Sequence, residues 1–79
     1  MFNARVISGD TFEYHPRNNP TETRTGFILW FTFEGSPYSF KMGFFNQDQI
    51  EKAKAAVASG KAVFKLEPDN NIAPRFVLA

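Results

Sequence analysis

The most regular pattern in the chain is an alternation of side chains between residues 26 and 45. In its first half, every second residue is large and apolar: Phe27, Leu29, Phe31 and Phe33. In its second half, the same spacing is taken by Tyr38, Phe40, Met42 and Phe44. A period of two is typical of β-strands, and residues 34–37 between the halves have the composition of a turn. The pattern predicts a β-hairpin with one face in the core.

Three further stretches alternate in the same way and are predicted to be strands: residues 2–8, 61–67 and 75–79. Gly9 and Asp10 interrupt the first stretch as a bulge or turn, and residues 11–14 then resume the alternation. In the second stretch two assignments stay open, with either Val63 facing inward or the larger set Ala62, Phe64 and Leu66. Residues 68–71 read as a turn, and Pro74 lies just before the last strand.

After residue 45 the spacing changes to that of a helix ending at Ser59 and Gly60. Asn46 is a favoured N-cap, Gln49 completes the spacing of a capping box, and Asp48 suits the positive end of the helix dipole. Phe45 and Ile50 have the spacing of a hydrophobic staple. The predicted apolar stripe is Ile50, Ala53 and Val57. Lys52 and Lys54 fall on its solvated side.

Residues 15–25 contain no large apolar side chain and carry two cations, Arg17 and Arg24. They predict a long polar loop. A loop of this length in a small domain is either functional or merely tolerated.

Composition limits the possible functions. The 79 residues form one domain of a size that often needs extra support, for which a homodimer is the expected source. There is no cysteine and one histidine, His15, so neither a disulfide nor a metal site is expected, and no cofactor is. No nucleophile motif, carboxylate pair or phosphate-binding glycine loop appears, so we do not expect an enzyme. No signal peptide or membrane-length apolar run occurs, which predicts a cytoplasmic location.

The order of elements is strand, strand, strand, helix, strand, strand. It is the order of the OB-fold, a small five-stranded, partly open β-barrel with a helix between strands three and four. Over the whole chain this layout resembles the small OB-fold single-stranded DNA-binding proteins, including the helix-destabilising proteins of bacteriophages. The resemblance implies a phage- or plasmid-encoded protein of DNA replication.

The opposite face of the predicted strands carries the candidate binding site. If the first three strands are neighbours, Trp30 is flanked by Arg5 and Lys41. A ring on which a base can stack, beside cations for the phosphates, is typical of single-stranded DNA or RNA binding. Gly43 would allow a close approach of the nucleic acid. Further candidates for this site are Tyr38 at the hairpin tip and the cations Arg17, Arg24, Lys65 and Arg75.

Two alternatives remain open on the sequence. Trp30 could instead pack in a second small core or a dimer interface, because tryptophan is enriched in interfaces of every kind. The formal net charge of only +1 favours a different function, a protein-interaction module or phage-encoded inhibitor that docks a host protein through the hairpin. By their period, five of the ten phenylalanines belong to the core: Phe27, Phe31, Phe33, Phe40 and Phe44.

Overall fold

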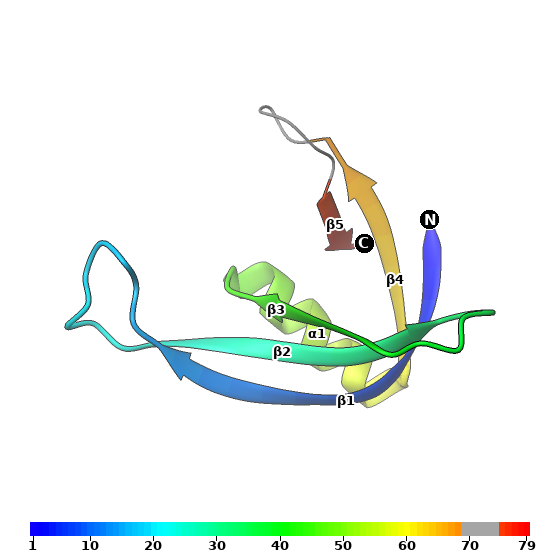
Figure 1. Cartoon of the computed structure of the whole chain (residues 1–79), viewed down its shortest axis with the longest axis horizontal. Coiled ribbons are helices and arrows are strands. Elements are labelled where there is room, and N and C mark those ends of the chain that lie inside the picture. Colours follow the sequence, from blue (N-terminus) through cyan, green and yellow to red (C-terminus); the bar gives the residue numbers. More distant parts are fainter. Residues whose placement is uncertain (69–74) are drawn as a thin grey trace.

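The structure is a computed structural model that describes residues 1–68 and 75–79. Its elements are, in chain order, β1 (Phe2–Tyr14), β2 (Arg24–Phe33), β3 (Phe40–Phe44), α1 (Gln47–Ser59), β4 (Lys61–Glu67) and β5 (Arg75–Leu78). The strands form one antiparallel sheet in the order β3-β2-β1-β4-β5 (Figure 1). The mainly β fold with one helix between strands three and four is therefore confirmed. The turn predicted at residues 68–71 lies mostly outside the described residues.

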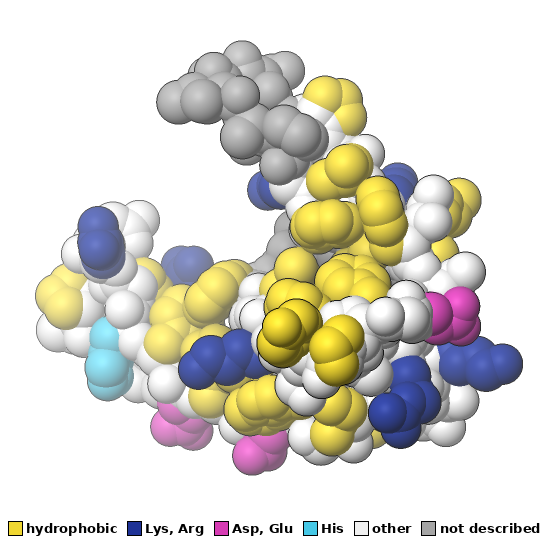
Figure 2. All heavy atoms as spheres, turned by 45° about the vertical axis from the view of Figure 1, so that its right-hand side comes forward, with side chains coloured by type: hydrophobic (Ala, Val, Ile, Leu, Met, Phe, Trp, Pro, Cys, Tyr) yellow, Lys and Arg dark blue, Asp and Glu magenta, His cyan; other side chains and the backbone are white. Residues whose placement is uncertain are grey.

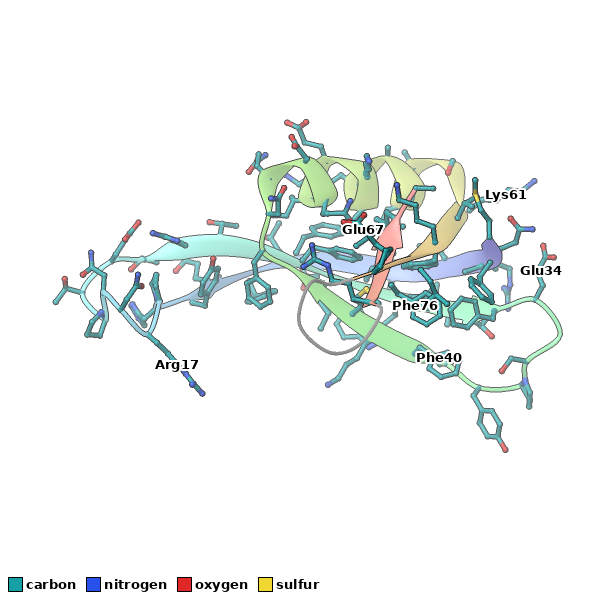
Figure 3. All side chains as sticks on the ribbon, turned by 90° about the horizontal axis from the view of Figure 1, so that it is seen from above. Arg17, Glu34, Phe40, Lys61, Glu67 and Phe76 are labelled. Carbon is teal, nitrogen blue, oxygen red and sulfur yellow. The ribbon has the colours of Figure 1, made fainter. Side chains whose placement is uncertain are left out.

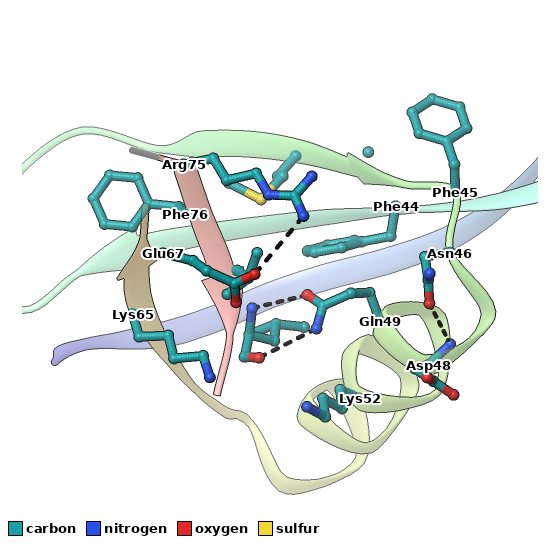
Figure 4. Close-up of a pocket in the computed structure, with 14 residues that line it drawn as sticks. Phe44, Phe45, Asn46, Asp48, Gln49, Lys52, Lys65, Glu67, Arg75 and Phe76 are labelled. Atoms are coloured by element: carbon teal, nitrogen blue, oxygen red, sulfur yellow. Dashed lines mark hydrogen bonds and ion pairs between the residues drawn. The ribbon is translucent and has the colours of Figure 1, made fainter. Parts of the chain in front are cut away.

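The sheet is curved but not closed into a barrel, so the prediction of a barrel goes too far. Strands β3 and β5 are the two edges of the sheet, and the β-ladders leave them unpaired with each other. The helix provides the physical reason. The Leu78 N–H of β5 donates to Gln49 Oε1 at 2.9 Å, and Gln49 Nε2 donates to the Leu78 carbonyl at 3.2 Å (Figure 4). One side-chain amide thus takes the place that a neighbouring strand would have at this edge.

This contact also changes how the helix begins. The Asp48 N–H donates to Asn46 Oδ1 at 2.9 Å, as expected for an N-cap. In a capping box the Gln49 side chain would turn back to the Asn46 N–H. Here its amide binds Leu78 instead, so only the Asn46 half of the predicted box forms. At the other end Gly60 closes the helix with φ of 79°, as predicted.

Replacing Gln49 by Ala is expected to reduce the free energy of unfolding by about 1–3 kcal/mol, because two partly buried backbone groups of Leu78 lose their partners. Urea denaturation followed by circular dichroism measures the change. The matched control is Gln47→Ala, at an exposed position in the same helical turn, for which we expect a change within about 0.5 kcal/mol. Equal losses in the two variants would show that the amide contact does not hold β5.

Strand β1 runs unbroken from Phe2 to Tyr14, so the interruption predicted at Gly9 and Asp10 is wrong. The irregularity lies earlier, as a β-bulge between Val6 and Ser8. Bulges bend strands, and β1 bends here: it pairs with β4 only before the bulge and with β2 on both sides of it (Figure 1). The extra residue reverses the phase of every side chain that follows. Strict alternation would direct Ser8 and Asp10 under the helix, whereas the bulge places Gly9 there.

The core lies between α1 and one face of the sheet, which we call the inner face. Its largest fully buried side chains are Leu29, Phe31 and Phe64. The rings of Phe31 and Phe64 lie 4.6 Å apart. The buried stripe of α1 is Ile50, Ala53 and Ala56, which corrects the predicted Val57; that residue is 38% exposed at the margin. On β4 the larger set faces inward, with Ala62 and Phe64 buried.

The inner face extends beyond the helix, and several of its rings are only partly covered. The predicted core residues Phe27, Phe31 and Phe44 are buried, but Phe33 is half-buried and Phe40 is 41% exposed. Strand β3 begins at Phe40, two residues later than the alternation predicted. Hydrophobic side chains gather over β4, β5 and the β2–β3 hairpin (Figure 2). The exposed members at this end of the molecule include Phe2, Phe40, Leu66 and Phe76.

Candidate nucleic-acid interface

Trp30 lies on the face of the sheet opposite α1, which we call the outer face. The helix covers one side of the β1–β2 pair and leaves the other side free (Figure 3). Phe31, the next residue after Trp30, is buried on the inner face, so Trp30 points outward and is half-buried. In the ladder Trp30 is directly opposite Lys41 of β3 and Ser8 of β1. The first three strands are thus neighbours, as the candidate site requires.

Arg5 is not directly beside Trp30, as the sequence predicted, but beside Thr32, two residues further along β2. Its partners are Thr32 on β2 and Lys61 on β4. The bulge is the reason: it inserts one residue between Arg5 and Ser8, so Ser8 rather than Arg5 stands beside Trp30. Arg5 therefore approaches Trp30 diagonally, at a separation that long side chains can bridge. Lys61, which the sequence analysis did not select, extends the row of cations onto β4.

The three cations of this outer-face row, Lys41, Arg5 and Lys61, are all exposed. In the part of the chain that the structure describes, two ion pairs form, Glu22–Arg24 and Glu67–Arg75, and neither involves the row. Asp10 is the acid on the same face near Trp30, two positions along β1 from Ser8, and its carboxylate accepts the Thr11 N–H at 2.9 Å. The row is therefore a local excess of positive charge that the net charge of the chain does not reveal.

Arg24 and Arg17 lie at the far end of the β1–β2 pair. Arg24 Nε donates to Glu22 Oε1 at 2.8 Å, and this hydrogen bond holds the pKa of Glu22 below its usual range. Arg17 lies in the loop of residues 15–23, at the opposite end of the molecule from Lys61 (Figure 3). The loop is organised by its own hydrogen bonds, among them Glu22 N–H to the Asn19 carbonyl at 3.1 Å. The structure does not bring these two arginines to Trp30.

Lys65 and Arg75 belong to a different region. They line a cleft of about 710 Å³ between the edges of β3 and β5 (Figure 4). Arg75 is paired there with Glu67 at 3.9 Å. Tyr38 is 70% exposed in the connection before β3 and has no position in the ladder beside Trp30. Of the eight residues predicted for the site, the structure therefore groups three, Arg5, Trp30 and Lys41.

Three aromatic residues that the sequence analysis did not select share the outer face with Trp30. The bulge turns Phe12 and Tyr14 outward, opposite Gly26 and Arg24 of β2. Phe45 joins them, with its ring centre 5.7 Å from that of Phe12 and 5.0 Å from that of Tyr14. Phe45 therefore does not form the predicted staple on Ile50, which lies in the core. The missing signal was the position of the bulge, because a strand read as strictly alternating gives Phe12 and Tyr14 the wrong side.

Other site chemistry is sparse. Among residues 1–68 and 75–79, no group of three or more histidine or acidic side chains could hold a metal ion. No helix in the described ranges is both long and apolar enough to cross a bilayer. Comparison of the chain with protein-family models, with curated proteins and with solved structures finds no match.

Proposed function

We propose that the protein binds single-stranded nucleic acid, DNA in the first instance, without sequence preference on the outer face of β1, β2 and β3. The observation that carries this proposal is the position of Trp30 directly opposite Lys41 and diagonal to Arg5, on a face that α1 leaves uncovered. The sheet order supports it, since an OB-fold barrel opened between strands three and five has the same order.

Each part of the row has a chemical role in this proposal. An indole ring offers a flat apolar surface on which a base of any kind can stack. Lys41, Arg5 and Lys61 are exposed cations around Trp30 that can neutralise phosphates of a strand bound there. Contacts of this kind involve no base edges, so the binding is expected to depend on salt and not on sequence.

Removing one cation of the row is expected to reduce the salt dependence of binding. For single strands, log K falls with log salt by about 0.7 for each phosphate contact. In Lys41→Ala or Arg5→Ala the slope should therefore become shallower by about 0.7, and binding at low salt should weaken. Fluorescence anisotropy of a labelled oligo(dT) over a series of salt concentrations gives both quantities.

The matched control for this measurement is Lys54→Ala. Lys54 is also exposed but lies on α1, which covers the inner face. Its removal changes the net charge by the same amount and should leave the slope unchanged. If all three variants alter binding equally, the interaction follows total charge and the outer-face row is not the site.

A second candidate function is a protein-interaction module, which the exposed inner-face rings favour. Phe40 and Phe76 are 41% and 37% exposed and lie on the part of the inner face that the helix does not cover (Figure 3). Exposed apolar clusters often mark protein contacts. The anisotropy experiment separates the two functions, because a module of this kind would leave the labelled oligonucleotide free at every salt concentration.

A further inference from the structure

The three aromatic side chains Phe12, Tyr14 and Phe45 form what we call the arm cluster. It lies near the end of the β1–β2 pair that leads into the loop of residues 15–23, and we call this end of the pair the arm. Phe45 stands nearly perpendicular to both neighbours, at 85° to Phe12 and 84° to Tyr14. The rings of Phe12 and Tyr14 are 5.9 Å apart and tilted by 46°. Edge-to-face contacts of this kind hold aromatic rings in defined orientations. The three rings therefore form a group in mutual contact.

Two glycines form the surface beneath the arm cluster. A Cβ atom at Gly26 would lie 2.6 Å from Phe12 Cζ, which shows that the Phe12 ring lies directly on the Gly26 backbone. Gly43 has the same relation to Phe45 at a looser 3.7 Å. Covering a glycine in a strand stabilises a sheet and accounts for Phe12.

Covering a glycine does not account for Phe45, which remains 58% exposed. Phe45 directly follows β3, and its ring points to the other side of the chain from the buried Phe44 (Figure 4). Phe45 belongs neither to the buried core nor to the side chains that pack against it.

The arm cluster and Trp30 are parts of one track. Gly26 and Trp30 are four residues apart on β2, which corresponds to about 13 Å at roughly 3.3 Å per residue. Ile28 lies between them on the same face, opposite Gly43 and Asp10. The outer side chains of β2, Trp30 and Ile28, are thus apolar and lead towards Phe45, with Lys41 and Arg5 at the Trp30 end and Asp10 of β1 beside Ile28. A stacked strand rising about 3.4 Å per base would cover this distance with about four bases.

We propose that the arm cluster is a second base-stacking site, with Phe45 as its contact residue, and that bound single-stranded nucleic acid runs along β2 from Trp30 towards the arm. This inference rests on the proposed function, because it assigns a second subsite for the same ligand. The proposal predicts that affinity depends on the length of the oligonucleotide. An oligonucleotide of three bases can occupy Trp30 alone, whereas one of eight bases reaches both sites and gains affinity from the second.

The test compares oligo(dT) of three and eight bases on Phe45→Leu, which keeps an apolar side chain and removes the flat ring. Quenching of Trp30 fluorescence measures binding of the short ligand, and anisotropy measures binding of the long one. Stacking contributes about 1–3 kcal/mol per base, which corresponds to about 5- to 150-fold in affinity. We expect the long ligand to lose affinity within this range and the short ligand to bind as before.

Two further variants complete the experiment. Phe45→Tyr retains a ring and should restore the affinity for the long ligand. Phe40→Leu makes the same substitution on the inner face, at the first residue of β3, and should change neither affinity. Unchanged binding of the eight-base ligand to Phe45→Leu, or equal losses for both lengths, would overturn the second site while leaving Trp30 binding intact. An absence of Trp30 quenching in the unaltered protein would instead overturn the proposed function itself.

Discussion

Replacing Trp30 by Ala is expected to weaken the binding of oligo(dT) by about 5- to 150-fold and to leave the protein folded. The loss corresponds to about 1–3 kcal/mol for one stacked base. The fold should survive because Trp30 points away from α1 and belongs neither to the buried core nor to the side chains that pack against it. Anisotropy of labelled oligo(dT) at low salt gives the affinity, and urea denaturation followed by circular dichroism gives the stability.

Two controls distinguish stacking from packing at this position. Trp30→Phe retains a ring and should keep most of the affinity. Phe40→Ala removes an exposed ring from the inner face and should not affect binding. Unfolding of Trp30→Ala would show that the indole is a structural side chain, as the alternative interpretation of the sequence holds.

Replacing Gly9 by Val is expected to reduce the free energy of unfolding substantially. A Cβ atom at this position would lie 2.6 Å from Val57 Cγ2 and 2.7 Å from Phe27 Cζ, so these packed side chains have to move to admit it. Inserting carbon atoms into a packed core typically costs about 1–3 kcal/mol. A domain of this size has a stability of roughly 0.05–0.15 kcal/mol per residue, so this loss is a large fraction of the total. Urea denaturation followed by circular dichroism measures it.

Gly43→Ala is the matched control for the Gly9 variant. Gly43 also lies in a strand of the sheet, but a Cβ atom there would be 3.7 Å from the Phe45 ring, an ordinary van der Waals contact. We expect the free energy of unfolding to change by no more than about 0.5 kcal/mol. Similar losses at the two glycines would mean that the close approach of α1 to β1 at Gly9 is not a constraint on the fold.

Most of the elements could be predicted because their signals are local. Alternation over residues 27–33 and 61–67 identifies strands whether or not their neighbours are known. Asn46 and Gly60 mark the helix ends through backbone geometry that those residue types favour, and the structure has both caps. The order of the elements then restricted the topology to a few arrangements, of which the observed sheet is one.

The position of the β1 bulge could not be predicted because its cause is tertiary. Gly9 and Asp10 are the local signal for an irregularity, whereas the bulge occurs between Val6 and Ser8. Its position is consistent with the close approach of α1 at Gly9 and with the Val6 N–H, which donates to the Gly60 carbonyl at 3.0 Å. A shift of one residue moves every following side chain to the other face. This single displacement separates Arg5 from Trp30 by one step and brings Phe12 to the outer face.

The open edge of the sheet has a similar origin. Nothing in the sequence near Gln49 distinguishes a capping side chain from one that reaches β5, because Leu78 is distant along the chain and near only in the fold. Net charge was equally uninformative. A value of +1 averages the paired arginines, Arg24 and Arg75, with the row of cations on the outer face, and only the register of the strands separates them.

The fluorescence of Trp30 tests the central claim most directly, because it is the sole tryptophan and lies at the centre of the proposed site. Titration with oligo(dT) at low salt should quench the emission to saturation, and added salt should reverse the effect steeply as counterions compete for the phosphates. Emission that stays unchanged with the oligonucleotide in excess at low salt would contradict the assignment of the outer face as a nucleic-acid interface.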